Sequence, residues 1–380
     1  SVIGNHEFDY GQEVTGKRMD QATFKWVCAN VDMNNTGVPE PYEHYTINTD
    51  DLRITFLGLV ETNGKQNSII PSTHPFKVEN FTFERPENAV SRYSDIKNSE
   101  NADLYIALTH LGYNYSNGIM GDVQLAEMYP YFDLIIGGHT HSEADTIVNG
   151  IYIYQSGSYL QKLGKIELHV NDRQVVHEEF NLINLDIYPD ADPVLESTVI
   201  NYNQVMEAEL GEVVGYSHQF HNKSKVGCFY TDALRIRMDV DICFQNQGGI
   251  RAGLEEGEIT VGEVYAFDPF NNGAIIFEMS ISEIKNFLKG TSAGFYYSGI
   301  QISQQGSEIL ITDMENNIIP ENAIKRIGIN DYIPAVWDMY FQEDGDIQEY
   351  TTAEAIIYYL KHINSDVDYA DCGRYFQYNN

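Results

Sequence analysis

Three short stretches of the chain place nitrogen and oxygen side chains directly after an apolar run. These side chains are Asn5, His6 and Asp9 in the first stretch, His110 in the second, and His139 and His141 in the third. Each run is typical of a buried strand that ends in a polar loop. Three strand ends that meet at one edge of a sheet would bring imidazole and amide ligands together. Divalent ions such as Zn or Mn suit such ligands.

The alternative for any one of these histidines is an ordinary position in a surface loop. His139 and His141 are two positions apart, so an extended backbone would direct both side chains to one side. A single pair of this kind is weak evidence for a metal site. Three stretches with the same arrangement favour the metal site over the surface-loop interpretation.

The three stretches resemble motifs of the calcineurin-like metallophosphoesterases, and specifically of the 5′-nucleotidase family. The matching residues are Gly4-Asn5-His6-Glu7-Phe8-Asp9, Thr109-His110 and Gly137-Gly138-His139-Thr140-His141. The resemblance implies hydrolysis of a nucleotide phosphate ester by in-line attack of water at a site with two divalent metal ions. It assigns Asn5, His110 and His139 to one ion and His141 to the other.

The resemblance also gives roles to two residues outside the set of metal ligands. His6 would face the phosphate and stabilise charge on the transferring group or leaving oxygen, and Asp9 would orient and polarise that imidazole. Family members carry an Asp-x-His strand and a Gly-Asp loop before the first motif, and neither stands before Gly4. We therefore expect that an amino-terminal portion is absent and that the metal site here is partial. We also expect the 380-residue chain alone to lack appreciable activity.

The second half of the chain resembles the substrate-binding motifs of the same family. Residues 245–251 are similar to its N-G-G-G-I-R loop, and residues 268–272 to its P-F-G-N turn. The implied substrate-binding residues are Asn246, Gly248, Gly249, Arg251, Phe270 and Tyr340, with Trp337 as the alternative to Tyr340. The two aromatic rings would stack on the faces of the base. A core position is the alternative for Phe270, and Gln247 and the glycine-free turn before Tyr340 depart from the family pattern.

Two other functions stay open on these motifs. A 2′,3′-cyclic nucleotide phosphodiesterase or a nucleotide-sugar hydrolase could use the same scaffold, because the leaving-group chemistry is similar. A nucleotide-binding protein that has lost catalysis is the alternative from another class. The altered glycine-rich turn favours that alternative, and the intact set of Asn, His and Asp side chains in the three motifs opposes it.

Composition limits the class of protein and its partners. The 380 residues are 43% hydrophobic and 12% aromatic, as in a globular chain long enough for two domains. The net charge of −33 repels nucleic acid polymers, and no apolar run is long enough to cross a bilayer. A small nucleotide is the expected partner, and metals or arginines would have to supply the local positive charge that it needs. The sequence does not indicate the oligomeric state. The family resemblance implies a periplasmic, secreted or cell-surface protein.

The predicted fold is α/β (α+β) with two domains. A four-layer αββα metallophosphoesterase domain is expected over residues 1–188, a long linker helix within 189–211, and a smaller α/β nucleotide-binding domain over 212–380. Strands are predicted at 24–30, 52–60, 102–109 and 132–136, with 151–154 and 164–170 closing the sheet as antiparallel strands. Asp192 is a good N-cap for the linker helix, and Gly211 supplies its stop.

The cysteines form no C-x-x-C pair. They are Cys28, Cys228, Cys243 and Cys372. We expect mostly buried thiols, with a Cys228–Cys243 disulfide as the alternative.

Overall fold

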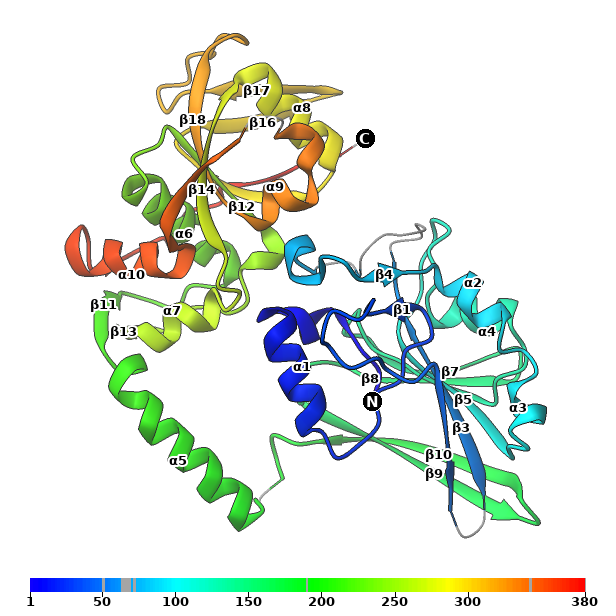
Figure 1. The fold of residues 1–380 in the computed structure, drawn as a ribbon. Helices are drawn as coiled ribbons and strands as arrows, with labels where there is room; N and C mark the ends of the chain where they lie inside the picture. The colour runs from blue at the N-terminus through cyan, green and yellow to red at the C-terminus, as the bar shows by residue number, and fades with distance from the viewer. Residues whose placement is uncertain (50–51, 63–69, 71–72, 189–190, 342–343, 380) are drawn as a thin grey trace. The chain divides into compact units, whose positions relative to one another are not determined.

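The computed structural model of the chain describes residues 1–49, 52–62, 70, 73–188, 191–341 and 344–379. The chain divides into two compact units, Ser1–Ala191 and Asp192–Asn380. Both combine helices with sheets (Figure 1), so the predicted two-domain α/β fold is confirmed. None of the helices among these residues has the length and apolarity that a membrane span requires.

The first unit is built on a six-stranded sheet in the order β2-β3-β5-β6-β8-β7. The four central strands run parallel, and they are β3 (Arg53–Val60), β5 (Leu104–His110), β6 (Leu134–Ile136) and β8 (Ile151–Ser156). The antiparallel edges are β2 (His44–Asn48) and β7 (Glu143–Val148). The central strands are apolar because both faces of the sheet are covered.

Each face of this sheet has its own apolar cluster. On one face α2 (Pro86–Ser91) and α4 (Asp122–Met128) pack through residues such as Val90 and Leu125. On the other face lies a two-stranded antiparallel ribbon, β9 (Lys162–Asn171) and β10 (Gln174–Asn184), whose Leu168 and Phe180 pack on the sheet. The prediction that 164–170 closes the sheet is therefore wrong, because β9 pairs with β10. The predicted strand 151–154 forms, but it runs parallel to β6.

The amino-terminal segment packs beside the carboxyl half of the sheet. It contains a turn of 3₁₀ helix, η1 (Asn5–Phe8), and α1 (Gly11–Gln21), where a simple polar loop was expected. Ile3 and Phe8 anchor this segment in a further apolar cluster. The strand predicted at 24–30 is reduced to isolated bridges of Val27 with Val2 and Tyr42. The short elements of this unit are β1 (Val31–Asp32), η2 (Pro75–Val78), β4 (Thr82–Phe83) and α3 (Ile96–Ser99).

The second unit begins with α5 (Pro193–Leu210). The side chain of Asp192 accepts hydrogen bonds from the backbone N–H groups of Val194 and Leu195, and Gly211 caps the other end, so both predicted caps of this helix are confirmed. That α5 links two domains stays a prediction, as do the predicted domain boundaries.

A second six-stranded sheet, in the order β19-β14-β18-β12-β15-β21, forms the core of this unit. Its strands are β12 (Ile242–Asn246), β14 (Gly273–Ser280), β15 (Gly294–Ser298), β18 (Ile324–Asn330), β19 (Asp346–Thr351) and β21 (Tyr375–Gln377). A three-stranded sheet joins β11 (Val213–Ser217) with β13 (Gly257–Thr260) and β20 (Asp366–Val367), and β16 (Gln301–Gln305) pairs with β17 (Glu308–Thr312). The helices are α6 (Lys223–Arg237), α7 (Val261–Phe267), α8 (Ile281–Thr291), α9 (Tyr332–Val336) and α10 (Thr352–His362), with one-turn helices η3 (Gln247–Gly249) and η4 (Asp338–Tyr340).

The expected cysteine chemistry is corrected by the structure. Cys228 on α6 forms a disulfide with Cys372, across 144 positions of sequence, and Cys243 is a buried free thiol. The expected alternative, Cys228–Cys243, is therefore wrong. The carboxyl-terminal segment folds back over α6, where Lys225 Nζ donates to the carbonyl oxygen of Cys372 at 2.6 Å. The spacing of the cysteines along the sequence does not indicate that the carboxyl-terminal segment folds back over α6.

Candidate functional site

His110 and Asn5 meet at the carboxyl end of β5. His110 is the last residue of that strand, and Asn5 is the first residue of η1. His110 Nε2 lies 2.8 Å from Asn5 Oδ1. Gly4 allows this approach, because a Cβ atom at that position would lie 2.9 Å from the His110 ring. Two segments that are far apart in sequence thus place an imidazole and an amide at one point.

His139 and His141 stand in the loop that follows β6, the neighbour of β5. The rings of His110 and His139 have centroids 4.8 Å apart, and the ring of His141 lies 5.4 Å from that of Tyr159. His139 has φ +87° and His141 φ +58°, so the expected extended backbone is wrong. Left-handed conformations cost free energy for such residues and cluster at functional sites.

The pKa values of the imidazoles reflect their crowding. Burial lowers the pKa of His110 to about 3, with further lowering by His139, His6 and His141. Burial also lowers the pKa of His139 to about 4, assisted by His6 and His141. His110 and His139 are therefore neutral at pH 7, which is the form that binds metals. His6 and His141 lie close enough to lower the pKa of both His110 and His139, so the structure brings the predicted histidines together.

His6 and Asp9 form a pair beside this cluster. His6 Nδ1 lies 2.8 Å from Asp9 Oδ2, and the His6 side chain is 41% exposed. Both residues belong to the turn that η1 forms, where a separation of three positions brings side chains to one side. Asp9 fixes the orientation of the His6 ring, so the expected proximity of this pair is present in the structure.

Sequence reasoning missed two buried carboxylates in this unit. Asp122 accepts hydrogen bonds from Thr109 Oγ1 at 2.5 Å and from Gln155 Nε2 at 2.7 Å. Burial raises the pKa of Asp122 to about 7. Glu61 follows β3 directly and is 2% exposed, and its backbone N–H donates to the carbonyl oxygen of His110. Glu61 stands immediately after an apolar run, as His110 does. The pattern that identified His110 could therefore have identified Glu61 as well.

Asp122 joins the ends of the two strands that carry the histidines. It holds Thr109, the residue before His110, and it packs against Gly137 in the loop after β6. A Cβ atom at Gly137 would overlap the Asp122 carboxylate. This requirement explains a glycine at the start of the His139 loop.

The loop around Asn246 in the second unit is held by buried amides. Asn330 Nδ2 donates to Gln245 Oε1 at 2.7 Å and to Asn246 Oδ1 at 3.0 Å. Gly249 lies so close to the Gln245 amide that a Cβ atom there would overlap it. Gly248 is in the same turn, η3, with the Asn246 amide nitrogen as its near neighbour. Asn330 is a further residue that sequence reasoning missed.

Arg251 and Phe270 lie together at the end of that loop. The Arg251 guanidinium stands 5.6 Å from the centre of the Phe270 ring, and Arg251 Nη1 donates to the Gly248 carbonyl oxygen at 3.4 Å. The turn that carries Phe270 is anchored by buried Asp268, which accepts hydrogen bonds from Tyr230 and Thr352. The structure thus gathers Asn246, Gly248, Gly249, Arg251 and Phe270 around one loop.

Tyr340 and Trp337 occupy a different environment. The Tyr340 ring centroid lies 6.0 Å from that of Phe287 on α8, and its hydroxyl rests against Gly290. Trp337 contacts Phe287 and Phe295, with ring centroids 6.3 and 5.4 Å away. Both rings are partly buried against the core cluster of α8. Asp331, just before α9, lies near the Phe270 turn. Its backbone N–H donates a hydrogen bond to the Gly273 carbonyl oxygen.

Comparison with known proteins gives a family match within each unit. The calcineurin-like phosphoesterase family matches residues 1–143, and the 5′-nucleotidase C-terminal domain family matches residues 204–327. The chain is 26% identical to the trifunctional nucleotide phosphoesterase protein YfkN of Bacillus subtilis (strain 168), over 89% of this chain and 27% of that protein. It therefore spans about a quarter of the length of YfkN.

Two further comparisons cover all or nearly all of the chain. It is 24% identical to the 5′-nucleotidase of Vibrio parahaemolyticus over 100% of this chain and 79% of that protein. The crystal structure of a 5′-nucleotidase precursor from Thermus thermophilus has the same fold, with a TM-score of 0.81, 20% identity, and coverage of 98% of this chain and 82% of that one. The chain belongs to the 5′-nucleotidase family, with a metallophosphoesterase domain followed by a 5′-nucleotidase C-terminal domain.

Proposed function

We propose that the protein hydrolyses nucleotide phosphate esters of the 5′-nucleotidase type with the help of divalent metal ions. One observation carries the proposal: Asn5, His110 and His139 converge at the carboxyl ends of adjacent parallel strands. Ligand sites of open α/β sheets lie at that edge. The neutral state of the imidazoles supports metal binding rather than a structural ion pair.

Asn5, His110 and His139 would hold one divalent ion, and His141 would belong to a second. Zn, Mn or a similar ion held there would polarise a phosphoryl oxygen and lower the pKa of a water.

His6 and Asp9 would act on the phosphate. The contact with Asp9 orients the His6 ring, which can then stabilise charge on the phosphoryl group or the leaving oxygen. Phosphate-ester hydrolysis is among the slowest uncatalysed reactions, so its transition state needs large stabilisation. The charge stabilisation by His6 would supply part of it.

The second unit would bind the nucleotide. Phe270 offers a face for the base, and Arg251 places a cation beside that ring. Asn246 and the glycines of η3 let the backbone approach the ligand closely. Tyr340 stays the proposed second stacking residue, with Trp337 as the alternative, although each packs against the core and would have to turn outward.

We place the protein outside the cytoplasm. The Cys228–Cys372 disulfide supports this location, because disulfides persist in oxidising compartments.

A substrate panel tests the proposed function. The protein as its gene encodes it is stripped with a chelator and assayed with 5′-AMP, 2′,3′-cyclic AMP and a nucleotide sugar, before and after addition of Mn²⁺ or Zn²⁺. We expect phosphate release from 5′-AMP that requires the metal. Greater activity on either other ester would assign the corresponding phosphodiesterase or nucleotide-sugar reaction instead. Binding of 5′-AMP without turnover of any ester would contradict the proposal and favour a protein that only binds nucleotides.

The expected inactivity of the 380-residue chain alone stays a prediction, which the same assay tests when it is run on residues 1–380. The ligands assigned to the ions here, Asn5 and three histidines, are neutral and do not balance the charge of two divalent ions.

A further inference from the structure

The outer face of the β9–β10 ribbon carries a group of histidine and glutamate side chains apart from the cluster at His110. Among the residues that the structure describes, His169, His177 and Glu179 form a group whose ligand atoms all lie within 4.8 Å of one another. His177 Nε2 is 3.2 Å from Glu179 Oε1, and the two imidazole rings have centroids 5.3 Å apart. All three side chains are exposed, so an ion from solution can reach them.

The strand register places these side chains on one face. His177 is directly opposite His169, and Glu179 is two positions along the same strand, opposite Glu167. A bulge at Val176 produces this register. Before the bulge, Val175 faces inward opposite Val170, and after it His177 faces outward. Without the extra residue, alternation along the strand would keep His177 on the side of Val175, facing the core.

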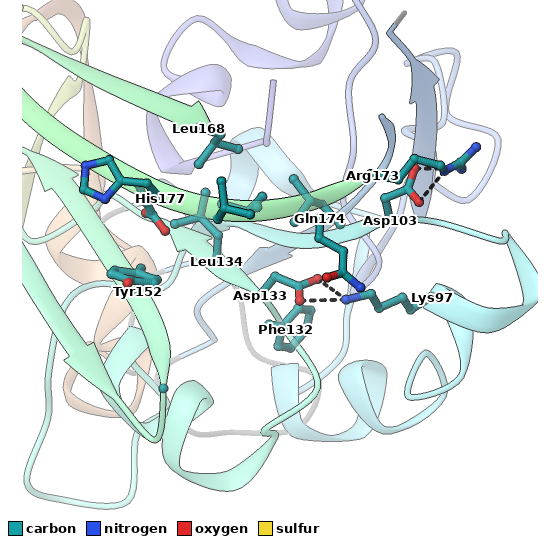
Figure 2. A pocket seen from close by; sticks show the side chains of 15 residues that line it. Lys97, Asp103, Phe132, Asp133, Leu134, Tyr152, Leu168, Arg173, Gln174 and His177 are labelled. Carbon is teal, nitrogen blue, oxygen red and sulfur yellow. Dashed lines mark hydrogen bonds and ion pairs between the residues drawn. The ribbon is translucent and has the colours of Figure 1, made fainter. Parts of the chain in front are cut away.

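The ribbon is held in place from its other side. Arg173, in the turn between the strands, forms two hydrogen bonds of 2.9 and 2.8 Å with the Asp103 carboxylate (Figure 2). Leu168 and Leu134 line a cavity of about 660 Å³ beneath the ribbon (Figure 2). A ligand set carried on two anchored strands loses less freedom on binding than one carried on loops.

This turn lies at the end of the sheet opposite to the His110 cluster. Asp103 directly precedes β5, whereas His110 is the last residue of that strand. A strand of seven residues is ~20 Å long. Two ion pairs stand at the cavity, Lys97 with Asp133 at 2.6 Å and Arg173 with Asp103 at 2.8 Å.

We propose that His169, His177 and Glu179 form a binding site for a divalent transition-metal ion of the Zn²⁺ class. Two imidazole nitrogens and one carboxylate oxygen form a ligand set that binds Zn²⁺, Ni²⁺ and Cu²⁺ in preference to Mg²⁺ and Ca²⁺. The ion would join the two strands across the ribbon and leave a coordination position open to water. It would stabilise the folded first unit, because an ion that binds the native state shifts the unfolding equilibrium.

Zn²⁺ titration by calorimetry tests this site. The protein is compared with H169A, H177A and the matched control E167Q, which changes the carboxylate opposite Glu179 and leaves the three ligands intact. We expect each histidine variant to lose one Zn²⁺ per chain, and E167Q to retain it. E179Q should bind about tenfold more weakly, because one oxygen ligand loses its charge.

Circular dichroism establishes that each variant is folded. Hydrolysis of 5′-AMP should be unchanged in H169A, so loss of this site and failure of the proposed function are separate results. Equal Zn²⁺ stoichiometry and affinity in the wild type, H169A and H177A would overturn the proposal. Equal weakening by E167Q would also overturn it, because the acidic face as a whole would then attract the ion.

Discussion

Asp122 is the buried charge that joins the two histidine-bearing strand ends of the first unit. Its pKa is raised to about 7 by burial, whereas an unfolded Asp titrates near ~4. The folded state therefore binds this proton more tightly, and its contribution to stability is full below pH ~4 and is lost as pH rises to about 7. His110 and His139 act in the opposite direction, because their lowered pKa values make the fold lose stability as pH falls below ~6.5.

Replacing Asp122 by Asn isolates this contribution. Gln155 Oε1 is buried without a hydrogen-bond partner among the described residues, so a rotated Gln155 amide can accept from the new Asn amide. The unfolding free energy of D122N minus that of the wild type should rise by on the order of 2–3 kcal/mol as the pH is raised from 5 to 8. Urea unfolding followed through Trp26 in a W337F background measures it. A pH-independent difference would mean that Asp122 does not titrate in this range.

Phe270 is the residue that tests nucleotide recognition. F270A should raise KM for 5′-AMP by the equivalent of about 1–3 kcal/mol, because a stacking surface is lost, and should leave kcat little changed. A small aryl phosphate should be hydrolysed as before. F220A, which removes an exposed ring of the same unit, is the control. Equal losses on both substrates would show that Phe270 is a packing residue.

At the scale of elements, the sequence predicted the strands that carry the site better than it predicted their neighbours. β3, β5 and β6 are apolar runs that end in polar residues, so both the strands and the placement of His110 could be predicted from the sequence. The direction of β8 could not be predicted, because an apolar run does not show which strand it will pair with. The 24–30 segment failed for a related reason: Val27 lies against β3 at Gly58, and it pairs through isolated bridges with Val2 and Tyr42.

Gly58 tests how that contact supports the site. A Cβ atom at Gly58 would overlap the backbone carbonyl of Val27, which neither residue can avoid by rotating a side chain. G58A should destabilise the first unit by about 1–3 kcal/mol. G16A is the matched control, because its Cβ would meet neighbours at an ordinary 3.6 Å and Ala favours the helix there. Equal stability of G58A and G16A in urea would show that the contact tolerates a side chain.

For the whole molecule, the sequence indicated two domains and the phosphoesterase family, but not the covalent link within the second unit. Cys228 and Cys372 are 144 positions apart, and only the folded carboxyl-terminal segment brings them together. The second stacking residue shows the same limit. Tyr340 matched a family position, yet its contacts with Phe287 and Gly290 depend on how η4 packs on α8.

The disulfide should stabilise one unit and leave the other unaffected. Loss of a native disulfide typically costs about 2–5 kcal/mol. Reduction with dithiothreitol should therefore lower the unfolding midpoint reported by Trp337, in the second unit, and leave the midpoint reported by Trp26 in place. C372S should show the lowered midpoint with or without reductant. Insensitivity of the wild type to reduction would contradict the assigned pairing.

The activity of H139A tests the central claim most directly. His139 is the residue through which β6 joins the cluster of Asn5 and His110, and its loss would remove a proposed metal ligand. In the gene-encoded protein with saturating Mn²⁺, kcat/KM for 5′-AMP should fall by at least about a hundredfold, equivalent to roughly 3 kcal/mol of transition-state stabilisation. H362A, at the exposed end of α10, should retain wild-type activity. Undiminished hydrolysis by folded H139A would contradict the account, because the chemistry would then run elsewhere.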